Sequence, residues 1–545
     1  MHWKPASTIH RFRWPSASPG CLARPSKPSL LTRTHETFSP HPSRRRCMKS
    51  TPLFLALAAL LSLAACQGTA TPDPATHDGQ QRLGRLVFEP CTLTSPQLNT
   101  SLSAQCSTLQ VAENPDAPDG RQIDLRIAWV QAENPAAAEP DPVFMLAGGP
   151  GQSAIQTFPQ VQMAFADVLK NRHVILLDQR GTGDSNLLAC PQTDADGQDS
   201  SPEAMRKMAQ TCAAALSQKA DLRYYTTTDA VRDLDAVRQA IGADKINLMG
   251  ISYGTRVAQQ YALRHPQHTR SVLLDSVVPN SQPLGSIFAR NLDDALALYF
   301  AQCQHDADCR AKLGDTRAQL DALLARLKQN PVTVRYRDAS THEEASTLLT
   351  ADMLAGLVRM YAYMPQAAAL LPKLIHDAHA GRYEGITALA KMLARQMDQS
   401  MAMGMQLSVI CTEDAGSFNA SEADHATVLG AEFSQGMGAM CEVWPHGKLP
   451  EDFRTPLAGN IPVLAISGEF DPVTPPRYGD EAIAKLDNAT HLVLKGQGHN
   501  VITVGCMPKV FAQFIESAAP KALETQCLDN LSQTPPFTTF NGWNP

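Results

Sequence analysis

Seven short apolar runs, separated by turn residues and amphipathic stretches, place the strongest limit on what this chain can fold into. They cover residues 125–130, 142–146, 173–177, 245–249, 270–274, 462–466 and 491–494. Several consist almost entirely of Val, Ile and Leu, which is typical of strands whose two faces are both covered. Strands that alternate with helices build a parallel sheet. The pattern therefore predicts an α/β fold, with a mainly parallel sheet flanked by helices.

A long segment between the fifth and sixth runs breaks this rhythm. Residues 281–458 are rich in Ala, Leu and Met, and we predict helices over 291–302, 316–328 and 384–405. A chain of 545 residues also exceeds what one core usually organises. We therefore expect a core built from residues 66–280 and 459–545, with residues 281–458 inserted as a helical cap.

The segment Gly250-Ile251-Ser252-Tyr253-Gly254 follows the fourth apolar run and precedes a helical stretch over 255–264. Glycines two residues before and after a serine permit a tight, strained turn from strand to helix, which exposes the hydroxyl. The bare motif is weak, and its position between a strand and a helix makes it specific. Ser252 is therefore the predicted nucleophile.

A serine hydroxyl needs a base to remove its proton and a carboxylate to orient that base. Asp471 follows the sixth run, and His499 follows the seventh in Lys495-Gly496-Gln497-Gly498-His499. The order Ser, Asp, His is that of the α/β-hydrolase fold and differs from two other serine-protease orders. We predict Asp471 as the acid and His499 as the base.

Two other carboxylates compete with Asp471 for the acid position. Glu469 lies in the same loop and is interpreted as a turn residue, while Asp275 follows the fifth run. His491, at the start of its strand, is interpreted as structural. Both carboxylates remain alternatives to Asp471.

The oxyanion of an acyl-transfer reaction needs backbone N–H donors. Tyr253 supplies the donor after the nucleophile, and the glycine-rich loop 147–151 after the second run supplies another, which we assign to Gly149. The segment 178–183 after the third run is interpreted as structural, through charge pairing.

These motifs together resemble the prolyl aminopeptidase and tripeptidyl aminopeptidase family of α/β-hydrolases, over roughly residues 122–530. The resemblance rests on Gly148-Gly149-Pro150-Gly151, Asp178-Gln179-Arg180-Gly181, Gly250-Ile251-Ser252-Tyr253-Gly254 and Gly468-Glu469-Phe470-Asp471-Pro472-Val473-Thr474-Pro475. Ala147 departs from the pattern, since many members have His or Pro there. The resemblance implies a serine peptidase that releases residues or short peptides from free N-termini.

An enzyme of that kind must bind the ammonium group of its substrate, and a cap carboxylate is a suitable partner. In Cys411-Thr412-Glu413-Asp414 we predict Glu413 as that group, with Asp414 second. The alternative is a solvated acidic loop.

Other functions remain open or are disfavoured. A carboxylesterase or lipase is an alternative, because it can have the same triad and the triad does not determine which leaving group the enzyme accepts. A non-catalytic adhesion or scaffold protein is the alternative from another class. Enzymes of this fold that use an Asp nucleophile are disfavoured by Ser252. No metal or cofactor is expected, and a net charge of −6 without a dense basic stripe argues against nucleic-acid binding.

Residues 48–65 read as a lipoprotein signal peptide, with a positive start, a short apolar centre and small residues. Leu63-Ala64-Ala65-Cys66 resembles a bacterial lipobox, so Cys66 is the predicted lipidation site, holding the protein on a membrane and facing the periplasm. The alternative is a plain signal peptide with an incidental Cys, which predicts a secreted or periplasmic protein. The residue after Cys66 is Gln67. An Asp at that position would favour the inner membrane, so Gln67 indicates that the protein lies in the outer membrane. Residues 1–47 read as an over-extended, disordered start, and a twin-arginine signal at 44–46 ranks second.

Ten cysteines follow Cys66, an even number typical of disulfides in an oxidising compartment. Their short separations favour pairing between sequence neighbours. Cys303, His305 and Cys309 resemble metal ligands but lack a fourth, which favours a disulfide.

Overall fold

A computed structural model describes residues 79–95, 98–191, 201–285, 287–339 and 341–542. The predictions for residues 1–47, for the signal peptide 48–65 and for Cys66 lie outside these ranges. Among the described residues, no helix combines the length and apolar character needed to cross a bilayer.

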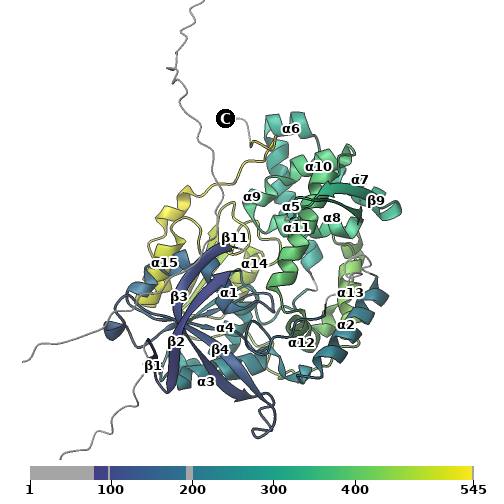
Figure 1. The fold of residues 1–545 in the computed structure, drawn as a ribbon. Helices are drawn as coiled ribbons and strands as arrows, with labels where there is room; N and C mark the ends of the chain where they lie inside the picture. Colours follow the sequence, from purple (N-terminus) through teal and green to yellow (C-terminus); the bar gives the residue numbers. More distant parts are fainter. Residues whose placement is uncertain (1–78, 96–97, 192–200, 286, 340, 543–545) are drawn as a thin grey trace, which may run out of the picture. The chain divides into compact units, whose positions relative to one another are not determined.

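A ten-stranded sheet carries the fold, in the order β1-β2-β3-β4-β6-β5-β7-β8-β11-β12 (Figure 1). The strands are β1 Gln81–Leu83, β2 Leu86–Ser95, β3 Leu98–Ala112, β4 Gln122–Val130, β5 Val143–Leu146, β6 Val174–Leu177, β7 Ile246–Ile251, β8 Thr269–Asp275, β11 Val463–Gly468 and β12 Ala489–Leu494. Strands β6, β5, β7, β8, β11 and β12 pair in parallel, and β1 to β4 add an antiparallel edge. The predicted α/β fold is confirmed, and all seven apolar runs are strands.

Strand β5 shows why the central runs are apolar throughout. Val143 and Met145 belong to one hydrophobic cluster, while Phe144 and Leu146 belong to another. Because successive side chains of a strand point to opposite faces, both faces of the sheet are covered. Helices α3 Thr227–Ala240 and α4 Tyr253–Arg264 contribute to the second cluster, and α1 Ala154–Val161 and α15 Met507–Ser517 to the first.

The inserted segment, residues 281–458, contains nine α-helices and a hairpin within its described residues (Figure 1, teal and green). The helices are α5 Phe288–His305, α6 Ala307–Leu313, α7 Thr316–Gln329, α8 Ala351–Ala362, α9 Pro365–Ala368, α10 Leu371–His379, α11 Glu384–Ser400, α12 Met403–Glu413 and α13 Glu432–Cys441. Strands β9 Val332–Arg337 and β10 Glu344–Leu349 form the unpredicted antiparallel hairpin. The segment has its own hydrophobic cluster, which also includes Phe470 from the core.

The single helix predicted over 384–405 is wrong, because the chain turns between α11 and α12. Met401 is extended, and the N–H of Ala402 donates to the carbonyl of Gly151 at 2.9 Å. A tertiary hydrogen bond to the glycine loop thus replaces the helical bond that the local sequence favours.

Five disulfides join cysteines that are neighbours in sequence, as predicted. They are Cys91–Cys106, Cys190–Cys212, Cys303–Cys309, Cys411–Cys441 and Cys506–Cys527. Cys303 and Cys309 therefore serve as a crosslink between α5 and α6, as the sequence favoured over a metal site.

The remaining helices of the core, α2 Pro202–Leu216 and α14 Pro476–Ile483, follow the same rules of local sequence. Helix α2 begins with Pro202 in its first turn, and the Ser201 hydroxyl accepts from Ala204 N–H. Helix α14 likewise starts with Pro476, and it comes directly after the loop that contains Asp471.

Candidate active site

The turn between β7 and α4 holds Ser252 in a left-handed conformation, with φ 54° and ψ −121°. Its N–H donates to the carbonyl of Asp275 at 2.8 Å. A Cβ atom on Gly250 would lie 2.4 Å from the carbonyl oxygen of Gly254, and one on Gly254 would lie 2.3 Å from that of Leu146. Only glycine fits at these two positions, so close backbone packing maintains the strained serine.

The glycine loop after β5 lies directly beside this serine. A Cβ on Gly148 would come within 3.2 Å of the Ser252 Cβ. Gly149 has φ +104°, in the left-handed region that favours glycine. In the described part of the chain, the N–H groups of Gly149 and Tyr253 donate to no acceptor. Both are therefore available to a ligand.

His499 and Asp471 meet through a hydrogen bond. The His499 Nδ1 lies 2.8 Å from the Asp471 Oδ2. The Asp471 Oδ1 accepts from the N–H groups of Val473 and Thr474 at 2.9 and 2.8 Å, and Oδ2 also accepts from the Thr474 hydroxyl at 2.8 Å. With the carboxylate held this firmly, Nε2 is the ring nitrogen left for proton transfer.

The environment pushes the pKa values of this pair apart. Burial acts to raise the pKa of Asp471, but the charge of His499 and the hydrogen bonds outweigh it, so the pKa lies below its ordinary value. Burial acts to lower the pKa of His499, and the Asp471 carboxylate more than reverses this, so that pKa lies above its ordinary value. The pair is thus suited to hold an ionised acid beside a base that can gain a proton.

The two alternative carboxylates have other partners. Glu469 accepts from the N–H of Gly496 at 2.7 Å. Both oxygens of Asp275 accept from Val501 N–H at 3.0 Å, and Oδ2 also from Ile502 N–H at 2.9 Å. Burial raises the pKa of Asp275 to about 6. These carboxylates hold the backbone on either side of His499, and neither hydrogen-bonds to its ring in the described structure.

The end of β8 connects the serine to the histidine loop. Asp275 accepts the Ser252 N–H at its carbonyl, and the neighbouring Ser276 hydroxyl accepts the N–H of Asn500 at 2.8 Å. Asp275 also feels the charge of His499. The structure therefore brings Ser252, the glycine loop and the Asp471–His499 pair to the same end of the parallel strands.

The inserted segment contacts this site directly, through Tyr363 and Met401, neither of which was a predicted site residue. The His499 N–H donates to the carbonyl of Tyr363 at 2.8 Å, and the two rings pack edge to face with centroids 5.0 Å apart. The Met401 sulfur packs on the glycine loop, 3.1 Å from where a Cβ on Gly149 would lie. Tyr363 and Met401 carry no motif that would identify them, whereas the Asp-x-x-Thr spacing of Asp471 and Thr474 is visible in the sequence.

The predicted ammonium-binding carboxylates are buried in a network between α12 and the core. The Glu413 Oε1 accepts from Thr227 N–H at 2.7 Å, and Oε2 accepts from the Thr227 hydroxyl at 3.0 Å. Asp414 forms ion pairs with Arg256 at 2.9 Å and Arg454 at 2.6 Å. Burial raises the pKa of Glu413 to about 7.

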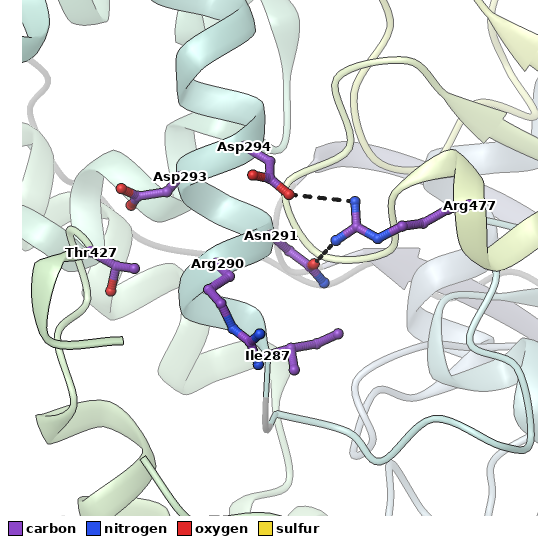
Figure 2. Close-up of a pocket in the computed structure, with 7 residues that line it drawn as sticks. All are labelled: Ile287, Arg290, Asn291, Asp293, Asp294, Thr427 and Arg477. Carbon is purple, nitrogen blue, oxygen red and sulfur yellow. Dashed lines mark hydrogen bonds and ion pairs between the residues drawn. The ribbon is translucent and has the colours of Figure 1, made fainter. Parts of the chain in front are cut away.

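This network also reaches the turn that carries the nucleophile. The Thr227 hydroxyl lies 2.7 Å from the Tyr253 phenol oxygen, so Glu413 connects through one side chain to the residue after Ser252. The structure therefore surrounds Glu413 and Asp414 with protein partners, and neither residue lines the cavity of Figure 2.

The segment 178–183 and His491, both interpreted as structural from the sequence, bond to other side chains of the core. Arg180 forms a two-pronged ion pair with Asp233 at 2.6 and 2.7 Å. His491 contacts Ser467 at 2.9 Å and Asp480 at 2.8 Å. Among the side chains described, no group of three or more His, Cys, Asp or Glu residues has the arrangement of a metal site.

A cavity of about 240 Å³ lies between α5 and the start of α14 (Figure 2). It is lined by Ile287, Arg290, Asn291, Asp293, Asp294, Thr427 and Arg477. Arg477 bonds to Asn291 and lies 3.5 Å from Asp294. Asn291 in turn donates to the carbonyl of Val473 at 2.8 Å, so this wall of the cavity supports the loop that carries Asp471.

Comparison with known proteins agrees with this geometry. A family described as the alpha/beta hydrolase fold matches residues 141–505. Serine protease Hip1 of Mycobacterium tuberculosis is 24% identical over 459 residues, which cover 78% of this chain and 87% of that protein. Tripeptidyl aminopeptidase of Streptomyces lividans is 28% identical over 40% of this chain and 44% of its own length. Proline iminopeptidase of Neisseria gonorrhoeae is 27% identical over 28% of this chain and 36% of its own length. The family match spans more than half of the chain and contains Ser252, Asp471 and His499, and the chain therefore belongs to the α/β-hydrolase fold family.

Proposed function

We propose that this protein is an exported serine peptidase that releases residues or short peptides, of the prolyl or tripeptidyl type, from free N-termini. The observation that carries the proposal is the His499–Asp471 hydrogen bond at the strand ends that also bear the strained Ser252. Relatives named serine protease and tripeptidyl aminopeptidase support peptides as the substrate class.

In the proposed reaction, His499 Nε2 accepts the hydroxyl proton of Ser252 as the Ser252 Oγ attacks the peptide carbonyl. The N–H groups of Gly149 and Tyr253 donate to the resulting oxyanion, an interaction that typically contributes about 10²- to 10³-fold per donor. The protonated imidazole then gives its proton to the leaving amine. Water attacks the acyl-enzyme with His499 again as base, which releases the N-terminal product and restores Ser252.

The test of this function compares three kinds of substrate on the purified protein. Peptides with free N-termini should be cleaved faster than the same peptides with acetylated N-termini, and faster than simple esters. Preference for esters would support a carboxylesterase or lipase. A folded protein that cleaves none of them and resists a fluorophosphonate would support the non-catalytic alternative.

The role of Glu413 can be tested with Glu413→Gln in the same assays. If this carboxylate binds the substrate ammonium, kcat/KM for free-amine peptides should fall by about 10-fold or more, while a neutral ester is hardly affected. Equal losses on both substrates would contradict that role and would indicate that Glu413 acts through Thr227 and Tyr253. Asp414 is the second candidate, and its two arginine partners make a similar change there more damaging to stability.

We further propose that the mature chain starts at Cys66 and is lipid-anchored, facing the periplasm from the outer membrane. The support is the lipobox-like sequence before Cys66 and the five disulfides, which form in oxidising compartments. Wild-type protein should incorporate a labelled fatty acid and sediment with membranes, whereas Cys66→Ser should do neither. Labelling that persists in Cys66→Ser would rule out this anchor.

A further inference from the structure

Arg359, in the last turn of α8, is an arginine beside the proposed active site. Its guanidinium lies over the rings of Phe288 and Phe433, 5.3 and 5.2 Å from their centroids. Among the side chains that the structure describes, no carboxylate forms an ion pair with it. By contrast, Arg256 and Arg477 each face an aspartate.

Tyr363 links this arginine to the histidine of the active site. Arg359 lies against the Tyr363 phenol, and the Tyr363 ring packs on the His499 imidazole. Burial raises the pKa of Tyr363, and the charge of Arg359 opposes that rise, as it also opposes the rise at His499. The Tyr363 ring lies between the guanidinium and the imidazole, so these two groups are on the order of 10 Å apart. About three residues of an extended peptide span such a distance.

The surroundings of Arg359 favour one kind of ligand. Aromatic rings attract the face of a guanidinium, so the N–H donors in its plane can bond to other groups. One side of the Arg359 guanidinium faces the Tyr363 phenol, and the other donors are available to a ligand. All three side chains are partly buried, so water competes less than on an open surface. A planar, fork-shaped cation in such a place is matched best by a carboxylate, through two parallel hydrogen bonds.

We propose that Arg359 binds a carboxylate of the peptide substrate a few residues from the scissile bond, so that the enzyme prefers peptides that carry one there. This inference rests on the proposed peptidase function. Two sources supply the same chemistry: the C-terminal carboxylate of a short peptide, and the side chain of Asp or Glu. Arg359 is thereby a specificity-determining residue that takes no part in proton transfer.

The experiment uses the full-length protein and matched pairs of peptides three to five residues long. One pair differs only in a C-terminal carboxylate or amide. The other pairs keep the amide and compare Asp with Asn at each position. The wild type should cleave the preferred carboxylate peptide about 10- to 100-fold faster in kcat/KM than its neutral match. The pair that shows this difference identifies the source.

Arg359→Gln should abolish the difference, mainly through KM, and Arg359→Lys should retain part of it. The matched control is Arg326→Gln, which removes an arginine stacked on Tyr383 elsewhere in the inserted segment and should keep the wild-type ratio. The rate of fluorophosphonate labelling at Ser252 should stay within about threefold in Arg359→Gln, because a merely structural loss would lower it.

Equal cleavage of all matched pairs by the wild type, or an equal loss on both members of a pair in Arg359→Gln, would overturn the inference. If Arg359→Gln does not fold, Arg359→Lys and competition by carboxylate and amide product peptides on the wild type decide the question. A wild-type protein that cleaves no peptide contradicts the proposed function itself, whereas one that cleaves all matched pairs equally contradicts only the role of Arg359.

Discussion

The Ser252→Ala variant is expected to lose about 10⁴- to 10⁶-fold in kcat on peptides and to resist covalent labelling by a fluorophosphonate. The reason is that Ser252 occupies the strained turn beside the glycine loop, whereas the nearby hydroxyls of Thr255 and Ser276 bond to backbone groups. Steady-state kinetics check the loss of kcat. Mass spectrometry that locates the label in the wild-type protein checks that Ser252 is the residue that reacts.

The control for this variant is Ser217→Ala, which changes an exposed serine just after α2 and should leave both activity and labelling unchanged. The melting temperature of Ser252→Ala should stay within a few degrees of the wild type. Substantial activity or labelling in a folded Ser252→Ala protein would show that the nucleophile lies elsewhere.

The Asp471→Asn variant should lower kcat by about 10³- to 10⁴-fold, because an amide cannot stabilise the imidazolium that forms on His499. The variant should also shift the pH profile. The base must be neutral to accept a proton, so activity is lost as pH falls through the pKa of His499. That pKa is raised in the wild type, which places the acidic limb above the ordinary value of about 6.5. Without the carboxylate the limb should move to lower pH.

Two matched variants separate Asp471 from its alternatives. Glu469→Gln keeps an acceptor for the N–H of Gly496 and should reduce kcat only slightly. Asp275→Asn should destabilise the fold, because this buried carboxylate accepts two backbone N–H groups beyond His499. The charge of Asp275 also raises the pKa of His499, but by less than Asp471 does, so Asp275→Asn should move the acidic limb downward less than Asp471→Asn. If either of these changes moved the limb further downward than Asp471→Asn, the assignment of the acid would be wrong.

The core of the fold was predictable from sequence because its signals are local. Continuous apolar runs reveal strands buried on both faces, and glycines at fixed offsets reveal Ser252. Strands β1 to β3 escaped prediction because they form a partly exposed edge, where polar residues alternate with apolar ones, as in β2. The hairpin of β9 and β10 was missed for the same reason, since both strands alternate buried and exposed positions.

The parts of the site that were not predictable depend on contacts between distant segments. The position of Glu413 illustrates this, because a carboxylate two residues after a cysteine gives no sign that it will face Thr227, which lies 186 residues earlier. The end of α11 is a similar case, where a hydrogen bond to Gly151 overrides helix propensity. The contacts of Tyr363 and Arg359 are equally non-local, and neither residue belongs to a motif.

The attachment of the inserted segment at two points has a consequence for how this enzyme can be divided. The Tyr363 carbonyl holds the backbone of His499, and Phe470, next to Asp471, packs against Tyr299 inside the segment's own hydrophobic cluster. The base and the acid are thus each supported by residues far away in the chain. The segment is therefore not a detachable module: a minimal enzyme made by splicing residue 280 to 459, or a chimera that exchanges this segment for another, would keep the strands but lose the alignment of its reacting groups.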